Sequence, residues 1–141
     1  MLAQGLRDRP SPPSESQLAA LHALQDSVTL NRAACYTKPG VLQDWRKVHE
    51  LASTVLARDS RNAKTLFRRG QALLQLLNSA GGGGGGSGAV DAALADLTAA
   101  ATILPTDAGI NQLLAQAKRQ MAELEKAEER KLRAQFANMF K

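Results

Sequence analysis

Apolar residues recur every three or four positions along most of the chain, which is the spacing of one face of an α-helix. The pattern predicts helices that are separated by Pro-Gly, polar and glycine-rich breaks. Their expected ranges are 15–37, 41–58, 63–78 and 89–103, followed by a last helix that starts near Thr106-Asp107 and continues to the C-terminus.

Two segments lack this periodicity. Residues 1–14 contain three prolines and are expected to form a disordered lead, with a transit peptide as the alternative. Residues 80–88 are mostly glycine and are expected to form a flexible insertion in a surface loop. A phosphate-binding loop would need a lysine at the start of the following helix, where this chain has Ala89 and Val90 instead.

Composition supports a helical fold. Apolar residues make up 44% of the chain, and Ala and Leu dominate them while β-branched and aromatic residues are few. This mixture favours helix over sheet, so the fold class is predicted to be all-α. The 18 Lys and Arg residues exceed the 13 Asp and Glu residues, which gives a net charge of +5. That surplus would help attract an acidic partner, but it is too scattered to indicate nucleic-acid binding.

The cysteine count and the lengths of the apolar runs indicate the cellular compartment that is expected. A lone cysteine excludes an internal disulfide and fits a reducing environment, so the cytoplasm is expected, with the nucleus as an alternative. No apolar run approaches the ~20 residues that span a bilayer, and neither a membrane partner nor a secretory signal is expected.

Two of the predicted helices share a spacing of four, three and five residues between matching positions. The two sets are Val48, Ala52, Val55 and Ser60, and Ala93, Leu97, Ala100 and Pro105. Ala33 and Gly70 occupy equivalent small positions on the helices that precede these sets. The spacing resembles the Ala-x3-Phe-x2-Ala-x4-Pro pattern of tetratricopeptide repeats, with Leu97 at the Phe position. Such self-similarity predicts a stack of helical hairpins.

A more specific resemblance follows from four segments. Residues 30–38, 62–70, 93–105 and 133–141 resemble parts of the tetratricopeptide domain of large immunophilins. These are FK506-binding and cyclophilin-type prolyl isomerases that escort heat-shock protein 90. The resemblance implies about two repeats over 15–105, with the insertion at 80–88, and a capping and extension helix over 106–141. It also implies that the first repeat and the isomerase domain of the family are missing.

The resemblance implies a co-chaperone-like adaptor that binds the C-terminus of heat-shock protein 90 or 70. In that family five side chains grip the terminal aspartate of a Met-Glu-Glu-Val-Asp peptide, and three match Asn31, Lys64 and Arg68. Lys38 is a candidate for a further peptide contact. Independently of the resemblance, Lys64 and Arg68 are four residues apart, which places two cations on one helical face that could receive a carboxylate. The neighbouring Arg69 is expected to contact solvent or another repeat.

The five side chains that hold the terminal aspartate form a carboxylate clamp. Two of them belong to the family's first repeat, so this chain is expected to bind the peptide weakly. Without that repeat, the helix carrying Leu18, Leu21 and Leu24 would expose an apolar face. This face suggests an alternative function, a scaffold that binds a partner helix, and it also invites self-association.

No catalytic residue, metal site or cofactor is expected. Cys35 is predicted to be a small core residue, and neither His22 nor His49 is tied to it by a motif. Trp45 and Phe67 are also predicted to be core residues. The chain is therefore predicted not to be an enzyme. The alternative is that it belongs to a peptidyl-prolyl cis-trans isomerase whose catalytic domain is absent from this chain.

The charged segment 118–141 admits three interpretations. It could be a solvated extension of the last helix, a calmodulin-type target helix as in related immunophilins, or a membrane-surface helix. Phe136 and Phe140 favour the second of these. The four glutamates between 123 and 129 dilute the basic character and count against the last two.

Overall fold

The structure is a computed structural model that describes residues 9–79 and 86–140. The first eight residues of the predicted lead and residues 80–85 of the predicted insertion lie outside the described part. Within that part the helices are α2 (Glu15–Tyr36), α3 (Trp45–Arg58), α4 (Ala63–Ser79), α5 (Gly86–Ile103) and α6 (Ala108–Met139). The described residues form no strand, and the all-α prediction is confirmed.

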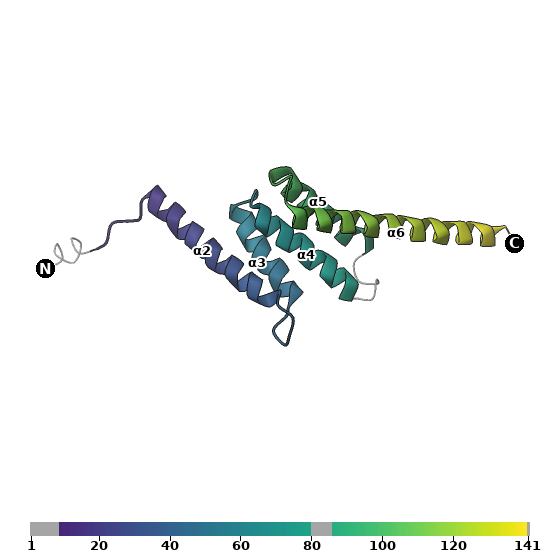
Figure 1. Ribbon diagram of the computed structural model, residues 1–141, viewed down its shortest axis with the longest axis horizontal. Helices are drawn as coiled ribbons and strands as arrows, with labels where there is room; N and C mark the ends of the chain where they lie inside the picture. The colour runs from purple at the N-terminus through teal and green to yellow at the C-terminus, as the bar shows by residue number, and fades with distance from the viewer. Residues whose placement is uncertain (1–8, 80–85, 141) are drawn as a thin grey trace.

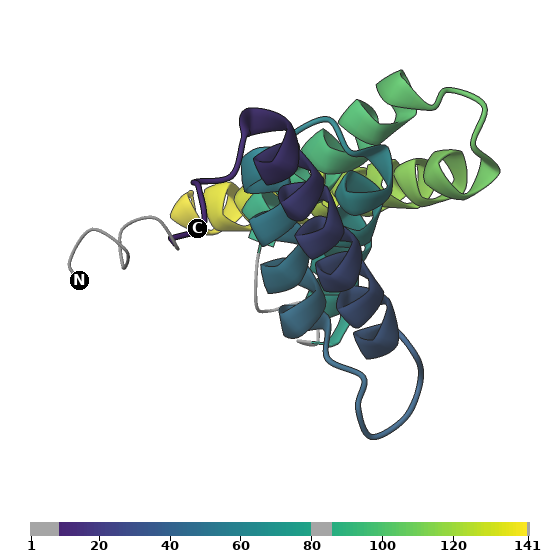
Figure 2. The same ribbon diagram turned by 90° about the vertical axis from the view of Figure 1, so that its left-hand side faces the viewer.

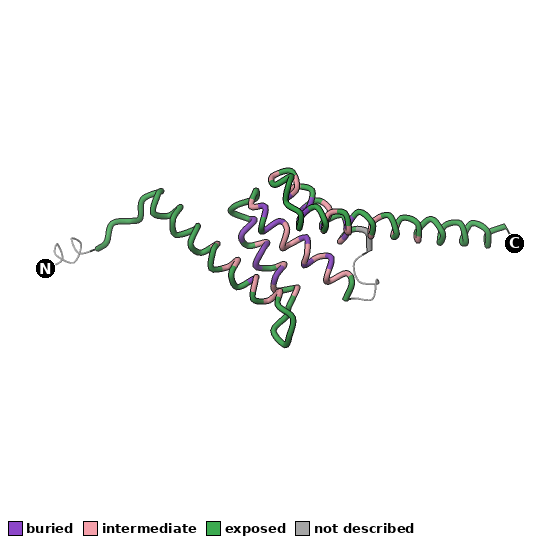
Figure 3. The backbone as a smooth tube through the Cα atoms, in the orientation of Figure 1, coloured by how far each residue is buried: buried purple, intermediate pink, exposed green. Residues whose placement is uncertain are grey.

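Consecutive helices pack side by side as hairpins (Figures 1 and 2). In order along the chain, α2 packs on α3, α3 on α4, α4 on α5 and α5 on α6, and α4 also touches α6. The first half of α2 and the last half of α6 project from opposite ends of this body (Figure 1). Figure 3 shows that burial is concentrated in α3, α4 and α5 and in the first part of α6.

Side-chain caps set where three helices begin. The Ser14 hydroxyl accepts from the Gln17 N–H while the Gln17 side chain accepts from the Ser14 N–H, which forms a capping box for α2. Asp44 caps α3 by accepting from the Lys47 N–H at 3.1 Å. Asp107 caps α6 by accepting from the Ile110 N–H at 2.9 Å.

The predicted helix 41–58 starts too early. Gly40 has a positive φ of 134°, which ends the turn after α2 in a conformation that favours glycine. Val41 and Leu42 follow it as exposed turn residues, and α3 begins at Trp45 after its Asp44 cap. The prediction started too early because Val41 and Leu42 are apolar and fit the helical spacing, although both precede the Asp44 cap.

The predicted insertion 80–88 extends too far. Helix α5 begins at Gly86, three residues before the expected start at Ala89. Glycine is a weak helix former, so the sequence indicated a loop. Val90 is only 1% exposed, and its burial anchors the first turns of the helix in the core. Packing therefore overrides propensity at this point.

The matching positions of the two predicted repeats are equivalent in the structure. Two triplets of repeat residues, one in each hairpin, are fully buried: Val48, Ala52 and Val55, and Ala93, Leu97 and Ala100. Ala33 on α2 and Gly70 on α4 are also buried, as their matching small positions require. The prediction of helical hairpins is thus confirmed at the level of packing.

Gly70 of α4 lies directly against the Leu97 side chain of α5. A Cβ added at Gly70 would lie 2.8 Å from Cγ of Leu97, which is closer than carbon atoms pack. The equivalent positions of the earlier hairpin are Ala33 and Ala52. The two hairpins therefore fill these positions with side chains of different size. One pairs glycine with leucine, and the other has alanine at both positions.

One face of α2 is apolar and exposed, because α3 is the described helix that packs on α2 and it covers another face. Leu21, Leu24 and Val28 are 48%, 63% and 52% exposed, and Ala33 is the buried residue of this helix. The prediction that Cys35 is a core residue is wrong, because its side chain is exposed. Cys35 lies two turns after Val28 on the same face, which no described helix covers.

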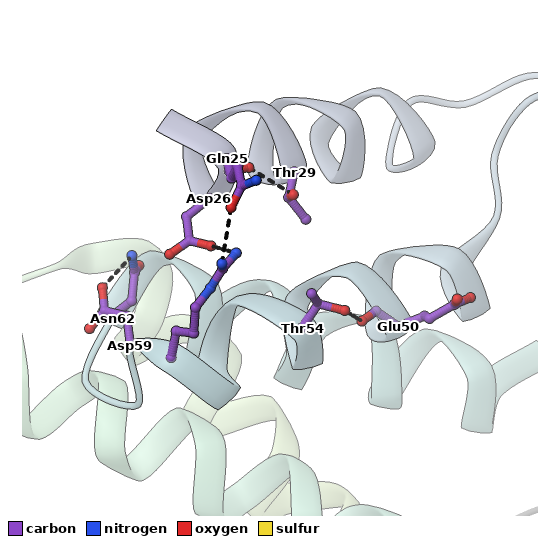
Figure 4. Close-up of polar contacts among 8 residues, drawn as sticks. Gln25, Asp26, Thr29, Glu50, Thr54, Asp59 and Asn62 are labelled. Carbon is purple, nitrogen blue, oxygen red and sulfur yellow. Dashed lines mark hydrogen bonds and ion pairs between the residues drawn. The ribbon is translucent and has the colours of Figure 1, made fainter. Parts of the chain in front are cut away.

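The polar contact that holds α2 on α3 comes from Arg58. Its guanidinium donates to the side chains of Gln25 at 3.1 Å and Asp26 at 2.7 Å. Figure 4 shows these two acceptors of α2 above the loop that carries Asp59 and Asn62. In that loop Asn62 donates to the Asp59 carboxylate, and its side-chain oxygen accepts from the Thr65 N–H at the start of α4.

The charged segment is a continuation of α6, which is helical to Met139. Phe136 and Phe140 are exposed, and their ring centroids are 5.1 Å apart. The three interpretations of this segment remain predictions.

We expect Gly70→Ala to lower the free energy of unfolding by up to about 2 kcal/mol. Overpacking against Leu97 costs ~1–3 kcal/mol, and the better helix propensity of alanine returns about 1. Leu97→Ala alone should cost ~2–5 kcal/mol through the cavity it leaves. The double variant should lose less than the sum, because the new methyl group grows into that cavity. Urea unfolding of the four proteins measures this, and simple additivity would contradict the close approach.

Candidate functional site

Helix α4 carries three basic side chains in two different settings. Lys64 and Arg68 are four residues apart and share one face, whereas Arg69 is turned by about 100° from Arg68. Arg69 makes a two-pronged ion pair with Asp96 of α5, with distances of 2.7 Å and 2.8 Å. Its third nitrogen lies 3.5 Å from the Ser53 hydroxyl of α3. The expected contact with another repeat is limited to Ser53, because the ion pair with Asp96 lies within the hairpin that carries Arg69.

The Arg69–Asp96 pair is part of the scaffold. The Asp96 residue is 6% exposed, and its hydrogen bonds and negative charge raise the pKa of Arg69 above its usual value, although burial opposes this. A two-pronged pair of this kind fixes the rotation of α4 relative to α5. The rotation in turn decides which way the face of Lys64 and Arg68 points.

Lys64 and Arg68 line one hollow of about 320 Å³. Its remaining walls come from Phe67, Leu104, Asp107, Gly109 and Ile110. The ion pairs in the described part of the chain are Lys47–Glu50, Arg58–Asp26, Arg69–Asp96 and Arg133–Glu129. Lys64 and Arg68 thus have no carboxylate partner among the described residues, and both charges are available to a ligand.

The start of α6 adds two opposing charges to this hollow. The first turn of the helix supplies the partial positive charge of its N-terminus. Asp107 supplies a carboxylate, which is exposed and bound to the Ile110 N–H. The hollow therefore combines two full positive charges with one nearby negative charge, and the balance favours an anion.

A second hollow of about 520 Å³ adjoins the first, because Phe67 and Gly109 line both. Its other walls all come from α6, namely Gln112, Leu113, Ala115, Gln116 and Arg119. We call the two hollows together the α4–α6 groove.

The repeat register explains why these residues face each other. Counted from Ser60, the residues Lys64 and Phe67 fall four and seven positions later. Counted from Pro105, Gly109 and Gln112 fall at the same offsets. Equivalent positions of α4 and α6 thus line one groove, as a stack of repeats requires.

The remaining predicted site residues lie elsewhere. Asn31 is exposed on α2, two residues before Ala33, just as Arg68 precedes Gly70. It occupies the equivalent position on the neighbouring repeat but does not line the α4–α6 groove. Lys38 is exposed in the turn after α2 and does not line it either. Lys64 and Arg68 are brought together, and the assignment of Asn31 and Lys38 stays a prediction.

Sequence reasoning missed Asp107 and Arg119. The repeat register contained the signal, since it places Arg119 on the groove face of α6. Phe67, predicted to be core, is partly buried against both core clusters and also forms the wall shared by the two hollows. Trp45 is likewise only partly buried.

Other kinds of site find little support in the described residues. No cluster of His, Cys, Asp or Glu side chains within 9–79 and 86–140 could hold a metal ion. Over the same ranges, the helices are too short or too polar to cross a membrane.

The chain was compared with protein families and with known proteins. No protein-family profile matches the chain. The protein named peptidyl-prolyl cis-trans isomerase D from Eremothecium gossypii is 33% identical over 131 residues. The match covers 91% of this chain and 32% of that protein, so the chain spans about a third of the length of its relative. The chain is therefore distantly related to a part of a protein that is named as a prolyl isomerase.

Proposed function

We propose that this chain is a protein-binding adaptor of the tetratricopeptide type, related to the helical part of large immunophilins. It receives an acidic C-terminal peptide, that of heat-shock protein 90 or 70, in the α4–α6 groove. The observation that carries the proposal is the contrast between neighbours on α4. Arg69 is neutralised by Asp96, whereas Lys64 and Arg68 share a hollow and have no described carboxylate partner.

The two cations suit a terminal carboxylate in complementary ways. Lys64 offers a mobile point charge, and Arg68 offers a planar fork of donors. Asn31 would add an amide donor to the carboxylate or to the peptide backbone. Each charge-assisted contact contributes ~1.5–3 kcal/mol, whereas micromolar affinity needs about 8 kcal/mol. The proposal is therefore one of weak binding, with dissociation constants in the micromolar range or above.

The repeat packing and the related protein support the same class of function. Fully buried residues recur at matched positions in two hairpins, as the tetratricopeptide interpretation requires. The related protein carries the name of a prolyl isomerase, and the proposal assigns to this chain a binding role rather than isomerisation.

We expect the chain to bind acetylated Met-Glu-Glu-Val-Asp and to lose that binding when the peptide C-terminus is amidated. Lys64→Ala and Arg68→Ala should each weaken binding by roughly tenfold, since each removes a charge-assisted contact. Isothermal titration calorimetry measures both effects. Arg46→Ala is the matched control, because Arg46 is an exposed cation on α3 that does not line the groove.

Equal affinity for the free and the amidated peptide would overturn the proposal. So would equal losses for Arg46→Ala and Arg68→Ala, because that would indicate attraction by net charge alone.

We expect Asp107→Asn to increase affinity for the same peptide by about two- to fivefold. The change removes a negative charge beside the anion site, and exposed charges interact by ~1 kcal/mol at contact distances. Asparagine caps helices about as well as aspartate, so α6 should keep its start. Titration at low and high salt checks the result, and the gain should shrink as salt screens the charge. An unchanged affinity at low salt would contradict the placement of the ligand carboxylate near Asp107.

The exposed face of α2 favours a second candidate function, a scaffold that binds a partner helix or a second copy through Leu21, Leu24 and Val28. If the chain self-associates through this face, Leu21→Gln with Leu24→Gln should make it monomeric at concentrations where the native chain is not. Analytical ultracentrifugation measures this. Leu132→Gln with Phe136→Gln on the exposed end of α6 is the control. A native chain that is monomeric throughout would count against self-association.

A further inference from the structure

Arg119 is a third cation on the α4–α6 groove that the predicted clamp does not include. It lines the hollow that adjoins the one formed by Lys64 and Arg68. Its side chain is exposed, and it forms no ion pair with any residue that the structure describes. It can therefore attract a second negative group of the same ligand.

The groove between the two cation sites is lined by side chains that suit a peptide. Gln112, Gln116 and Arg119 follow each other at four and three residues along α6, which places them in one row. A side-chain amide both donates and accepts, so Gln112 and Gln116 can satisfy the N–H and C=O groups of an extended backbone. Phe67 and Leu113 offer apolar contact beside this row.

The length of the groove sets the spacing of the two negative groups. Gly109, beside the first hollow, and Arg119 are ten positions apart, which is about 15 Å along a helix. An extended chain rises ~3.3 Å per residue, so this distance corresponds to four or five residues. Because side chains on a helix lean toward its N-terminus, the guanidinium shortens the span to about three or four residues.

We infer that Arg119 recognises an acidic side chain three or four positions before the terminal carboxylate of the bound peptide. The inference rests on the proposed function, because it takes Lys64 and Arg68 as the site of that terminal carboxylate. It adds a requirement that the carboxylate clamp lacks, namely that the ligand is acidic at a defined distance from its end.

The test is a double-mutant cycle between the protein and the peptide. The first glutamate of acetylated Met-Glu-Glu-Val-Asp lies three positions before the last residue and is changed to glutamine. Arg119→Gln is the protein variant, since both residues are good helix formers and the change removes the charge alone. Lys118→Gln is the matched control, because Lys118 is the adjacent exposed cation of α6 and does not line the groove.

For the native protein, the peptide change should weaken binding by about two- to fivefold, as expected for a partly exposed ion pair. Arg119→Gln should weaken binding of the unchanged peptide by the same factor. The affinity of this variant should not change further when the first glutamate of the peptide is replaced by glutamine. Lys118→Gln should behave as the native protein does. Circular dichroism of both variants confirms that α6 keeps its helix content.

The outcomes separate this inference from the proposed function. If Arg119→Gln retains the full effect of the peptide change while amidation still abolishes binding, the inference fails and the carboxylate clamp stands. If the second glutamate rather than the first couples to Arg119, the spacing argument fails. If no peptide binds the native chain, both the clamp and the Arg119 site are refuted.

Discussion

The contact between Gly70 and Leu97 sets the distance between α4 and α5, and much of the molecule depends on it. There is no room for a Cβ at Gly70 beside the leucine side chain, so a larger residue there would push the two helices apart. The Arg69–Asp96 ion pair lies next to this contact. The ion pair fixes the rotation of α4 relative to α5, and the glycine contact fixes the distance between the two helices. Together they hold the face of Lys64 and Arg68 toward α6, which supplies the other wall of the groove.

The same two contacts explain how three adjacent basic residues come to have different roles. One turn of helix separates Lys64 from Arg68, so they share a face, but Arg69 is rotated toward Asp96. Both oxygens of Asp96 are engaged by the Arg69 guanidinium, whereas Arg68 lies on the face that lines the hollow with Lys64. Arg69 thus belongs to the scaffold, whereas Lys64 and Arg68 have no carboxylate partner among the described residues.

The sequence predicted much of this architecture because packing positions follow a strict period. The matched triplets around Ala52 and Leu97 were identified from spacing alone, and all are buried. Failures occurred where a local interaction competed with the period. The Asp44 cap excluded Val41 and Leu42 from α3, and the burial of Val90 extended α5 into a glycine-rich segment.

For the candidate site, the sequence placed Lys64 and Arg68 together because a single helix fixes their separation. Asp107 and Arg119 were missed because their proximity depends on how α6 packs against α4, which residue spacing within one helix does not reveal. The prediction that Cys35 is a core residue was wrong for a related reason. Its apolar neighbours indicated a core, yet a helix face is buried only when another element covers it, and the described chain has none on that side of α2.

The open face of α2 and the α4–α6 groove lie on different helices, and in a hairpin stack each helix depends chiefly on its neighbours. A partner that covers Leu21 and Leu24 would therefore contact α2 and leave the Lys64–Arg68 hollow unchanged. If that partner is a second copy, two grooves become linked in one particle. If each groove binds weakly, as proposed, two linked grooves would bind a partner with two acidic tails more tightly through effective concentration than either does alone. Self-association through α2 would thus compensate for the weak binding proposed for a single groove, and the two candidate functions would then act together.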